Sequence, residues 1–198
     1  MSQQPTTHNH ERGAMTRIQP IDMQAATGRA RELLAELAAH GGEPGPMVRA
    51  MANAPALLRG YLDLNRAMKR NHLDRRIVER INLAVHEWLG CEYCLVAHTR
   101  AARQLGLSDA DIELARQGTA TDPNVAAMVA FGQQVIAAPG DVTDEQIDDL
   151  RGRGYTDEQI AEVIGLVSLQ LLTGALNLVA GIEPAPEDLA ELTSRRTR

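Results

Sequence analysis

Apolar residues recur at helical spacing along most of this chain, and glycine or proline ends each run. The first run stops at Gly41-Gly42 and carries Ala30, Leu33, Leu34 and Leu37. A period of 3.6 residues places such side chains on one face of a helix. Aromatic residues make up only 3% of the sequence, whereas strand-rich folds favour aromatic and β-branched residues. The pattern therefore predicts an all-α fold whose first helix begins near Met23.

The expected helix boundaries are marked by capping residues and glycines. The pentapeptide Thr-Asp-Glu-Gln-Ile occurs at 143–147 and at 156–160, and each copy has the pattern of a capping box that starts a helix. Asp74 is expected to cap another helix, and Gly90 is expected to end it. The apolar face predicted for that helix comprises Ile77, Ile81, Ala84, Val85 and Trp88. The following helix is then expected to begin at or near Cys91.

Composition along the chain predicts three segments. Residues 1–20 are polar and show no periodicity, which is typical of a mobile N-terminal arm. Residues 21–183 carry the helical pattern and form one predicted domain, and residues 184–198 form a C-terminal tail.

Charge and cysteine content exclude several classes of function. The net charge is −6 with both signs interspersed, and the basic face and stacking aromatics of a nucleic-acid-binding protein are missing. The two cysteines are too few for a secreted disulfide scaffold. Residues 1–17 lack the apolar stretch of a signal peptide. These features predict a cytoplasmic protein with a reactive dithiol.

One uncharged stretch, residues 163–182, is nearly long enough to span a membrane. Polar side chains and glycines interrupt it, and Glu162 and Glu183 flank it in place of the Lys or Arg that usually flank a membrane span. We therefore expect a helix that is buried on nearly all sides in a soluble oligomer, and no membrane segment.

The residues that carry chemistry are Cys91, Cys94 and His98, at positions i, i+3 and i+7 of one helical segment. Each step is about one turn, so the three side chains are expected on one face. Two cysteines one turn apart can form a disulfide with little backbone movement. A helix start near Cys91 favours thiolate, because free backbone N–H groups and the positive dipole end point at the sulfurs. The spacing suggests that Cys94 attacks and Cys91 resolves.

These roles predict thiol peroxidase or disulfide reductase chemistry without a bound cofactor or metal. A Cys94 thiolate attacks the O–O bond of a hydroperoxide and becomes a sulfenic acid, which Cys91 converts to a disulfide. An external thiol then reduces the disulfide, or the pair passes electrons to another protein disulfide. Glu79, on the preceding predicted helix, is a candidate for the proton relay with His98, although spacing alone does not place it beside the cysteines.

The same residues resemble the alkylhydroperoxidase D family, within the carboxymuconolactone decarboxylase superfamily. That family's pattern is Glu, eleven residues, Cys, two residues, Cys, three residues, His, and the chain has all four at Glu79, Cys91, Cys94 and His98. The likeness extends over roughly residues 45–183 and includes Ala101–Ser108, Gly154–Ile160 and the closing helix with Asn177.

The resemblance implies an all-helical AhpD-like fold that assembles as a homo-oligomer, typically a trimer or a hexamer. Cys94 would be the peroxidatic cysteine, Cys91 its partner and proton donor, and His98 and Glu79 the relay. Electrons would arrive from a lipoyl or thioredoxin-like donor and pass to a small hydroperoxide or to a peroxiredoxin. The best-known branch has His before the second cysteine, where this chain has Tyr93, a weaker base at neutral pH.

Four other interpretations stay open at this point. A Cys-x-x-Cys pair with His98 also suits zinc, with His86, Glu79 or His72 as a fourth ligand, although none has a motif's spacing. A second interpretation is that the cysteines pack as inert small apolar residues. A third is that the dithiol is a non-enzymatic redox sensor that controls assembly. A decarboxylase-type lyase is the fourth, and its branch generally lacks the paired cysteines. His86 is interpreted as a surface or helix-packing residue and Trp88 as core.

Overall fold

The computed structural model describes residues 16–194, which form ten α-helices and one short 3-10 helix. In chain order these are α1 (Gly28–Gly41), α2 (Pro46–Met51), α3 (Pro55–Met68), α4 (Arg75–Leu89), α5 (Glu92–Gln104), α6 (Asp109–Arg116), α7 (Pro123–Ala137), η1 (Pro139–Asp141), α8 (Asp144–Gly152), α9 (Asp157–Ala180) and α10 (Pro186–Ser194). The all-α prediction is confirmed.

Most predicted helix starts are the observed ones. The hydroxyls of Thr143 and Thr156 each accept a hydrogen bond from the backbone N–H three residues on, and both capping boxes are complete. Asp74 caps α4 through the N–H of Arg76. The first helix begins later than Met23, because Asp22 accepts hydrogen bonds from the next residues and forms a turn there. Local side-chain bonding therefore delays the start to Gly28.

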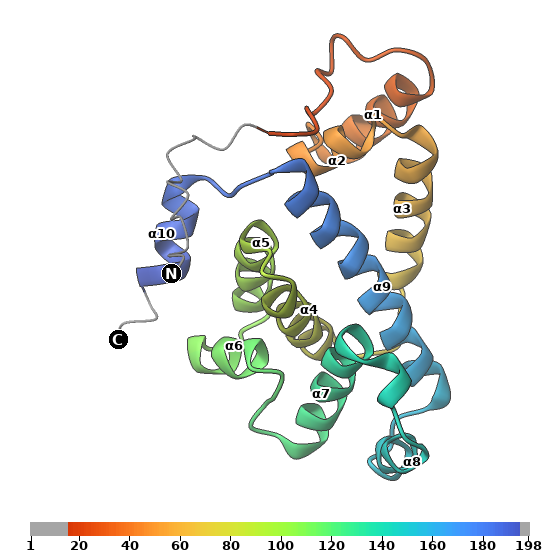
Figure 1. The fold of residues 1–198 in the computed structure, drawn as a ribbon, viewed down its shortest axis with the longest axis vertical. Helices are drawn as coiled ribbons and strands as arrows, with labels where there is room; N and C mark the ends of the chain where they lie inside the picture. The colour runs from red at the N-terminus through yellow and green to blue at the C-terminus, as the bar shows by residue number, and fades with distance from the viewer. Residues whose placement is uncertain (1–15, 195–198) are drawn as a thin grey trace, which may run out of the picture.

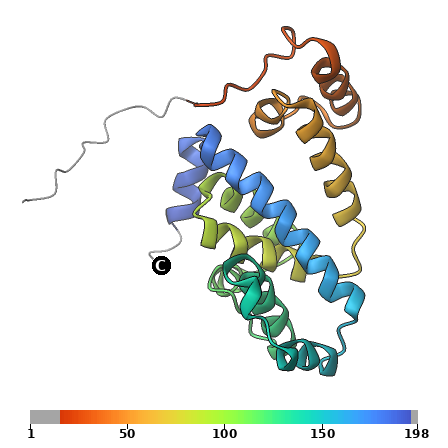
Figure 2. The same ribbon diagram turned by 45° about the vertical axis from the view of Figure 1, so that its right-hand side comes forward.

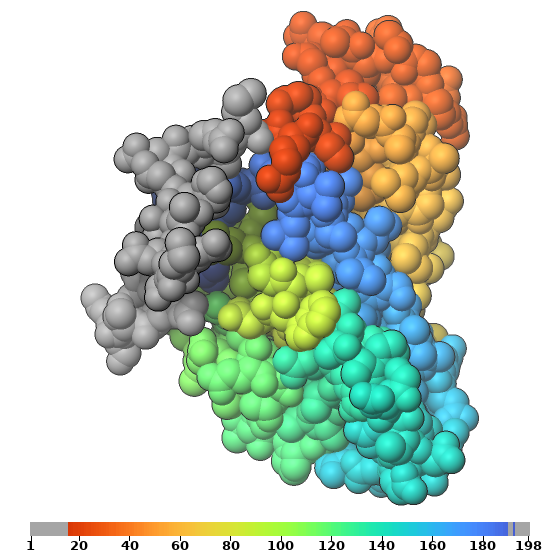
Figure 3. All heavy atoms as spheres, in the orientation of Figure 1, coloured from red at the N-terminus to blue at the C-terminus, as the bar shows by residue number. Residues whose placement is uncertain are grey.

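Helices α4 and α9 lie side by side through the middle of the molecule (Figures 1 and 2). The largest apolar cluster joins them to α7 and α8, and its fully buried members are Ile81, Ala84, Val85, Met128, Val129 and Val163. A second cluster joins α1, α2 and α3, which lie at one end of α9, and a third joins α4, α5 and α6. Figure 3 shows the α1–α3 region and the α7–α8 region at opposite ends of the molecule.

The described chain begins beside the last turn of α9 and ends beside α5. Of the predicted arm, residues 1–15 lie outside the described residues, whereas the amides of Arg17 and Ile18 donate to the carbonyl of Ala180. The predicted C-terminal tail contains α10, which packs against α5. An ion pair between Arg100 and Asp188 joins these two helices.

The long helix α9 has the length and apolar composition of a membrane span, with a mean hydropathy of 1.9 in its most apolar 18-residue window. Half of that window is buried against other helices, and a core helix meets the same criterion. Its exposed residues include Ile164, Leu171 and Leu178, which follow one another at seven-residue intervals and are 50%, 45% and 40% exposed. This helix is therefore central to the packing and also presents an apolar stripe at the surface.

The prediction that Trp88 belongs to the core is wrong, because its side chain is 50% exposed. The neighbouring Leu89 packs against the main cluster instead, and its Cδ1 lies close to Gly174 of α9, where a Cβ would approach it to 2.7 Å. The last turn of α4 thus partly buries Leu89 against α9 and leaves the Trp88 side chain exposed to solvent.

Candidate active site

The turn between α4 and α5 positions both cysteines. Gly90 ends α4 in the left-handed conformation at φ 70°, which a glycine adopts without strain. Cys91 follows as the N-cap of α5, and its Sγ accepts the N–H of Cys94 at 3.4 Å. A backbone N–H of the first turn of α5 therefore points at the Cys91 sulfur, an arrangement that favours thiolate there.

Cys91 and Cys94 are joined as a disulfide, with their Cα atoms 5.3 Å apart. Both side chains are buried. The spacing that predicted two sulfurs on one face of a helix therefore brings them into bonding contact. The two cysteines lie in adjacent positions of one helical turn, so closing this bond joins only neighbouring parts of the chain.

Glu79 and His98 form a second pair, between α4 and α5. His98 Nδ1 lies 2.7 Å from Glu79 Oε2, and both side chains are partly exposed. The amide nitrogen of Asn82, one turn along α4, lies 3.3 Å from the same Nδ1. Sequence spacing did not place Glu79, and the structure brings it to His98, because positions 79 and 82 lie on the face of α4 that meets α5.

His86 lies between this pair and the disulfide. Its ring stacks on that of His98, with centroids 5.0 Å apart, and its side chain is fully buried. A ring nitrogen of His86 and the Sγ atoms of Cys91 and Cys94 lie within 4.8 Å of one another. Burial and then the neighbouring His98 lower the pKa of His86 to about 3, so its ring is neutral at physiological pH.

Helix α9 contributes the third wall of the site. Gln170 Oε1 lies 2.9 Å from His86 Nε2, and the amide nitrogen of Asn177 donates to Cys94 Sγ at 3.3 Å. Both side chains are buried, and residues 170, 174 and 177 lie on one face of the helix. Polar residues that interrupt the uncharged stretch 163–182 therefore face the disulfide.

Within the described residues, three buried polar atoms around the site have no hydrogen-bond partner. They are the side-chain oxygens of Asn82 and Asn177 and the Nδ1 of His86. Buried polar groups are normally satisfied, since leaving one unpaired costs about 1–3 kcal/mol. All three belong to residues that contact His98 or Cys94, which is typical of a site that receives water, substrate or an ion.

The four residues predicted from the sequence fall into two bonded pairs, Cys91–Cys94 and Glu79–His98. Within the described residues, no hydrogen bond joins His98 to either sulfur; the contact between the pairs runs through His86. The surface alternative for His86 is wrong, because its side chain is fully buried between helices. The sequence did contain one signal for the place of His86 in the site, because residues 79, 82 and 86 form a polar stripe at helical spacing on α4.

Tyr93 replaces the histidine of the best-known branch and lies half-buried against the small apolar cluster of Ala50, Ala180 and Ile182. Burial, and then the negative charge of Asp188, raise the pKa of its phenol. The side chain is therefore a neutral packing residue at physiological pH.

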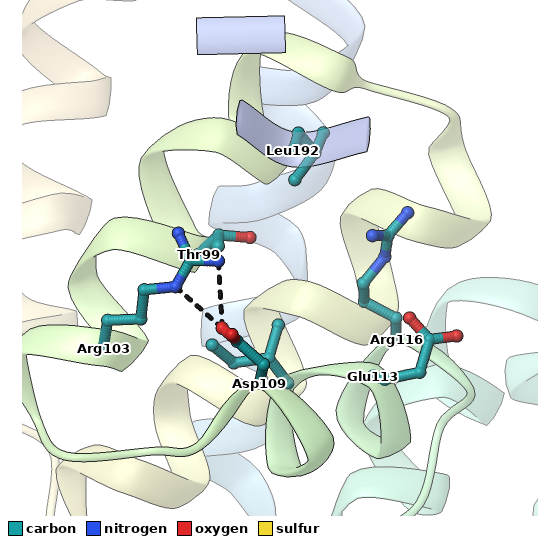
Figure 4. Close-up of a pocket in the computed structure, with 7 residues that line it drawn as sticks. Thr99, Arg103, Asp109, Glu113, Arg116 and Leu192 are labelled. Carbon is teal, nitrogen blue, oxygen red and sulfur yellow. Dashed lines mark hydrogen bonds and ion pairs between the residues drawn. The ribbon is translucent and has the colours of Figure 1, made fainter. Parts of the chain in front are cut away.

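A surface cavity of about 370 Å³ lies between α5, α6 and α10 (Figure 4). Its lining residues are Thr99, Arg103, Asp109, Ile112, Glu113, Arg116 and Leu192. Arg103 bonds to Asp109, and Arg116 pairs with Glu87 at 2.7 Å. The lining includes neither cysteine nor either histidine of the site, so this cavity is separate from the dithiol chemistry.

Fold and site together define an all-α protein with a buried Cys-x-x-Cys disulfide beside a Glu–His pair. Residues 55–137 match the model of the Carboxymuconolactone decarboxylase family, in agreement with the resemblance noted in the sequence. No curated protein matches the chain.

Solved structures share the fold over most of the chain. An alkylhydroperoxidase AhpD core, an uncharacterised peroxidase-related protein from Ralstonia eutropha JMP134, is 22% identical, with a TM-score of 0.72 over 87% of this chain and 95% of that one. A peroxidase-related protein from Silicibacter sp. TM1040 is 19% identical, with a TM-score of 0.71 over 87% and 94%. The debrominase Bmp8, solved with 2,3,4-tribromopyrrole, is 16% identical, with a TM-score of 0.72 over 91% and 97%. These likenesses establish the AhpD-like fold.

Proposed function

We propose that this protein is a thiol-dependent peroxidase that reduces small alkyl hydroperoxides through Cys94 and Cys91. The observation that carries the proposal is the bonded Cys91–Cys94 pair at the start of α5, with the Glu79–His98 pair on the same helix junction. A dithiol that closes locally stores the two electrons that one hydroperoxide needs.

In the first step, the Cys94 thiolate attacks the terminal oxygen of the O–O bond. The bond breaks, Cys94 becomes a sulfenic acid, and the departing alkoxide takes a proton and leaves as an alcohol. Asn177 supports the choice of Cys94, because its amide donates to that sulfur and stabilises negative charge there. His98, held by Glu79, is the partly exposed group that exchanges the proton with solvent.

In the second step, the Cys91 thiol attacks the sulfenic sulfur and releases water, which leaves the disulfide. An external dithiol of lipoyl or thioredoxin-like type then attacks the disulfide and restores both thiols. The same exchange serves a disulfide reductase if the electrons run to a protein disulfide, such as that of a peroxiredoxin. The cycle consumes one hydroperoxide and one dithiol and yields an alcohol, water and an oxidised dithiol.

The test is hydroperoxide consumption by the purified protein with a dithiol reductant. We expect multiple turnovers by the wild type, loss of turnover in Cys94→Ser, and retention in His72→Ala, whose side chain pairs with Glu162 away from the dithiol. One oxidation per chain without turnover would favour a redox sensor. Activity on a lactone acid that survives loss of either cysteine would favour a lyase.

The debrominase with the same fold gives a second substrate class for the assay. A thiolate can also attack bromine on an aromatic ring: the C–Br bond breaks, the ring carbon takes a proton, and the bromine passes to sulfur as a sulfenyl bromide. A second thiol then attacks that sulfur, forms the disulfide and releases bromide. Bromide release from 2,3,4-tribromopyrrole in the absence of hydroperoxide turnover would replace the peroxidase proposal with dehalogenation.

A cytoplasmic homo-oligomer is part of this proposal, because a reducing compartment maintains the dithiol and the exposed stripe of α9 suits a helix partner. Ile164, Leu171 and Leu178 repeat at seven-residue intervals and remain exposed. Light scattering on the wild type should give a trimer or a hexamer, and Leu171→Glu should reduce the mass toward that of one chain. An unchanged mass in Leu171→Glu would exclude this stripe as the interface.

A further inference from the structure

His86 carries a buried nitrogen that the proposed peroxidase cycle does not use. The side chain is 0% exposed, its Nε2 bonds to Gln170, and its Nδ1 has no partner among residues 16–194. A neutral imidazole whose Nε2–H donates to an amide oxygen has its lone pair on Nδ1. The free lone pair therefore lies in the interior, on a ring that has one nitrogen close to the two sulfurs.

The three atoms lie close enough together to form a metal-ligand set once the disulfide is reduced. A ring nitrogen of His86 and the Sγ atoms of Cys91 and Cys94 lie within 4.8 Å of one another. Zinc binds thiolate sulfur at about 2.3 Å and imidazole nitrogen at about 2.0–2.1 Å, so tetrahedral ligand atoms lie roughly 3.5–3.8 Å apart. Reduction separates the two sulfurs, and small side-chain rotations are enough to reach these spacings.

The surroundings support the ligand set as well. Metal-bound histidines usually donate their other N–H to a fixed acceptor, and Gln170 occupies that position for His86. Gly174 of α9 leaves the space beside Nδ1 open, since a Cβ there would lie 3.3 Å from it. Asn177, whose Oδ1 has no partner, bonds to Cys94 and would fix that ligand in turn.

We propose that the reduced protein binds one Zn²⁺ through Cys91 Sγ, Cys94 Sγ and His86 Nδ1, with the fourth position left to water. Two thiols lose two protons as the ion binds. Zinc and the disulfide use the same two sulfurs and exclude each other. One consequence rests on the proposed function: bound zinc holds the dithiol reduced and blocks its reaction with hydroperoxide until the ion is removed.

A second group of potential ligands provides the matched control. His72 lies near Glu158 and Glu162 at the surface, with Nδ1 2.8 Å from Glu162 and 3.6 Å from Glu158. Its two carboxylates are harder ligands, and the group is exposed, whereas the proposed site is buried and has two thiolates. His72→Ala removes this group and leaves the dithiol site intact.

The experiment titrates metal-free protein, reduced with a phosphine, with Zn²⁺ in competition with a chromogenic chelator. We expect one tight ion per chain, none in the oxidised protein, and loss of tight binding in His86→Leu and Cys91→Ser. Gln170→Leu should weaken binding about 10- to 100-fold, as expected for loss of a supporting hydrogen bond. His72→Ala should bind as the wild type does. Substituted Co²⁺ should give the visible spectrum of a tetrahedral thiolate site.

Absence of tight zinc in the reduced wild type overturns the inference, as does full affinity in a folded His86→Leu or loss of affinity in His72→Ala. If His86→Leu does not fold, the Gln170→Leu titration and the Co²⁺ spectrum decide, and an octahedral spectrum without sulfur charge transfer rejects the site. Hydroperoxide turnover is measured on the same zinc-free protein. Turnover without zinc binding refutes this inference alone, and zinc binding without turnover refutes only the peroxidase.

Discussion

Asn177 offers the sharpest test of how the fold activates Cys94. Its side chain is 1% exposed and lies on the face of α9 that meets the first turn of α5. From there its amide donates to Cys94 Sγ at 3.3 Å. A hydrogen bond to a charged group contributes about 1.5–3 kcal/mol. Asn177→Leu keeps a similar volume, removes this donor, and also removes an amide oxygen that has no partner.

The magnitude follows from the free energy of that bond. Every 1.4 kcal/mol is tenfold in an equilibrium, so the thiolate fraction below the titration midpoint should fall about 10- to 100-fold in Asn177→Leu. The assay is iodoacetamide alkylation of the reduced protein across pH, in a Cys91→Ser background so that a single thiol reacts. At mildly acidic pH the rate should fall by that factor, and at alkaline pH the two rates should converge.

The convergence separates electrostatics from access to the sulfur. A rate that falls equally at every pH would mean that the leucine blocks the reagent, and an unchanged rate at every pH would mean that Asn177 does not stabilise the thiolate. Either result refutes the reasoning. Ser168→Ala, on the exposed side of the same helix, is the control and should leave the alkylation profile unchanged.

Three further predictions concern stability. Gly132→Ala places a Cβ 2.8 Å from Ile81 in the core, so overpacking should cost about 1–3 kcal/mol, more than the gain in helix propensity. The Cβ of Gly60→Ala meets no atom of the described residues within 4 Å, so this variant should be more stable by about 0.5–1 kcal/mol. Urea unfolding that shifts both variants alike would contradict this packing. Thr156→Ala removes the cap of α9 and should lower the free energy of unfolding by about 1 kcal/mol in the same assay. Burial lowers the pKa of His86 from 6.5 to about 3, so the unfolded chain binds a proton that the folded chain does not, and stability should fall by about 1 kcal/mol per pH unit as pH drops between those values. With a chelator present, His86→Gln should flatten that slope, and an equal slope in both proteins would show that His86 is not the titrating group.

Local signals in the sequence predicted those parts of the fold that neighbouring residues determine. The boxes at Thr143 and Thr156 and the cap at Asp74 involve residues within one turn, so the pattern and the structure agree. Trp88 was mispredicted because periodicity gives the face of a helix but not how far its neighbours cover it. Its adjacent residue Leu89 takes the core position against α9.

The candidate site also has a part that local sequence predicts and a part that depends on the tertiary fold. The spacing of Cys91 and Cys94 was enough to predict their contact, since both lie in one turn of one helix. The bond from Glu79 to His98 depends on how α4 packs against α5, and the contacts of His86 and Asn177 depend on α9, more than 80 residues further along the chain. Contacts at that separation need the tertiary fold, although the polar stripes on α4 and α9 were visible in the sequence.

The central claim is that Cys94 is the nucleophile and Cys91 resolves it. Peroxide-treated Cys91→Ser protein, analysed by mass spectrometry with a sulfenic-acid trap, tests this most directly. The account predicts one trapped oxygen on Cys94 in this variant and a Cys91–Cys94 disulfide in the wild type. An untouched Cys94 thiol after peroxide treatment of the zinc-free variant, or oxidation that falls on Cys91 in Cys94→Ser at the wild-type rate, would contradict it.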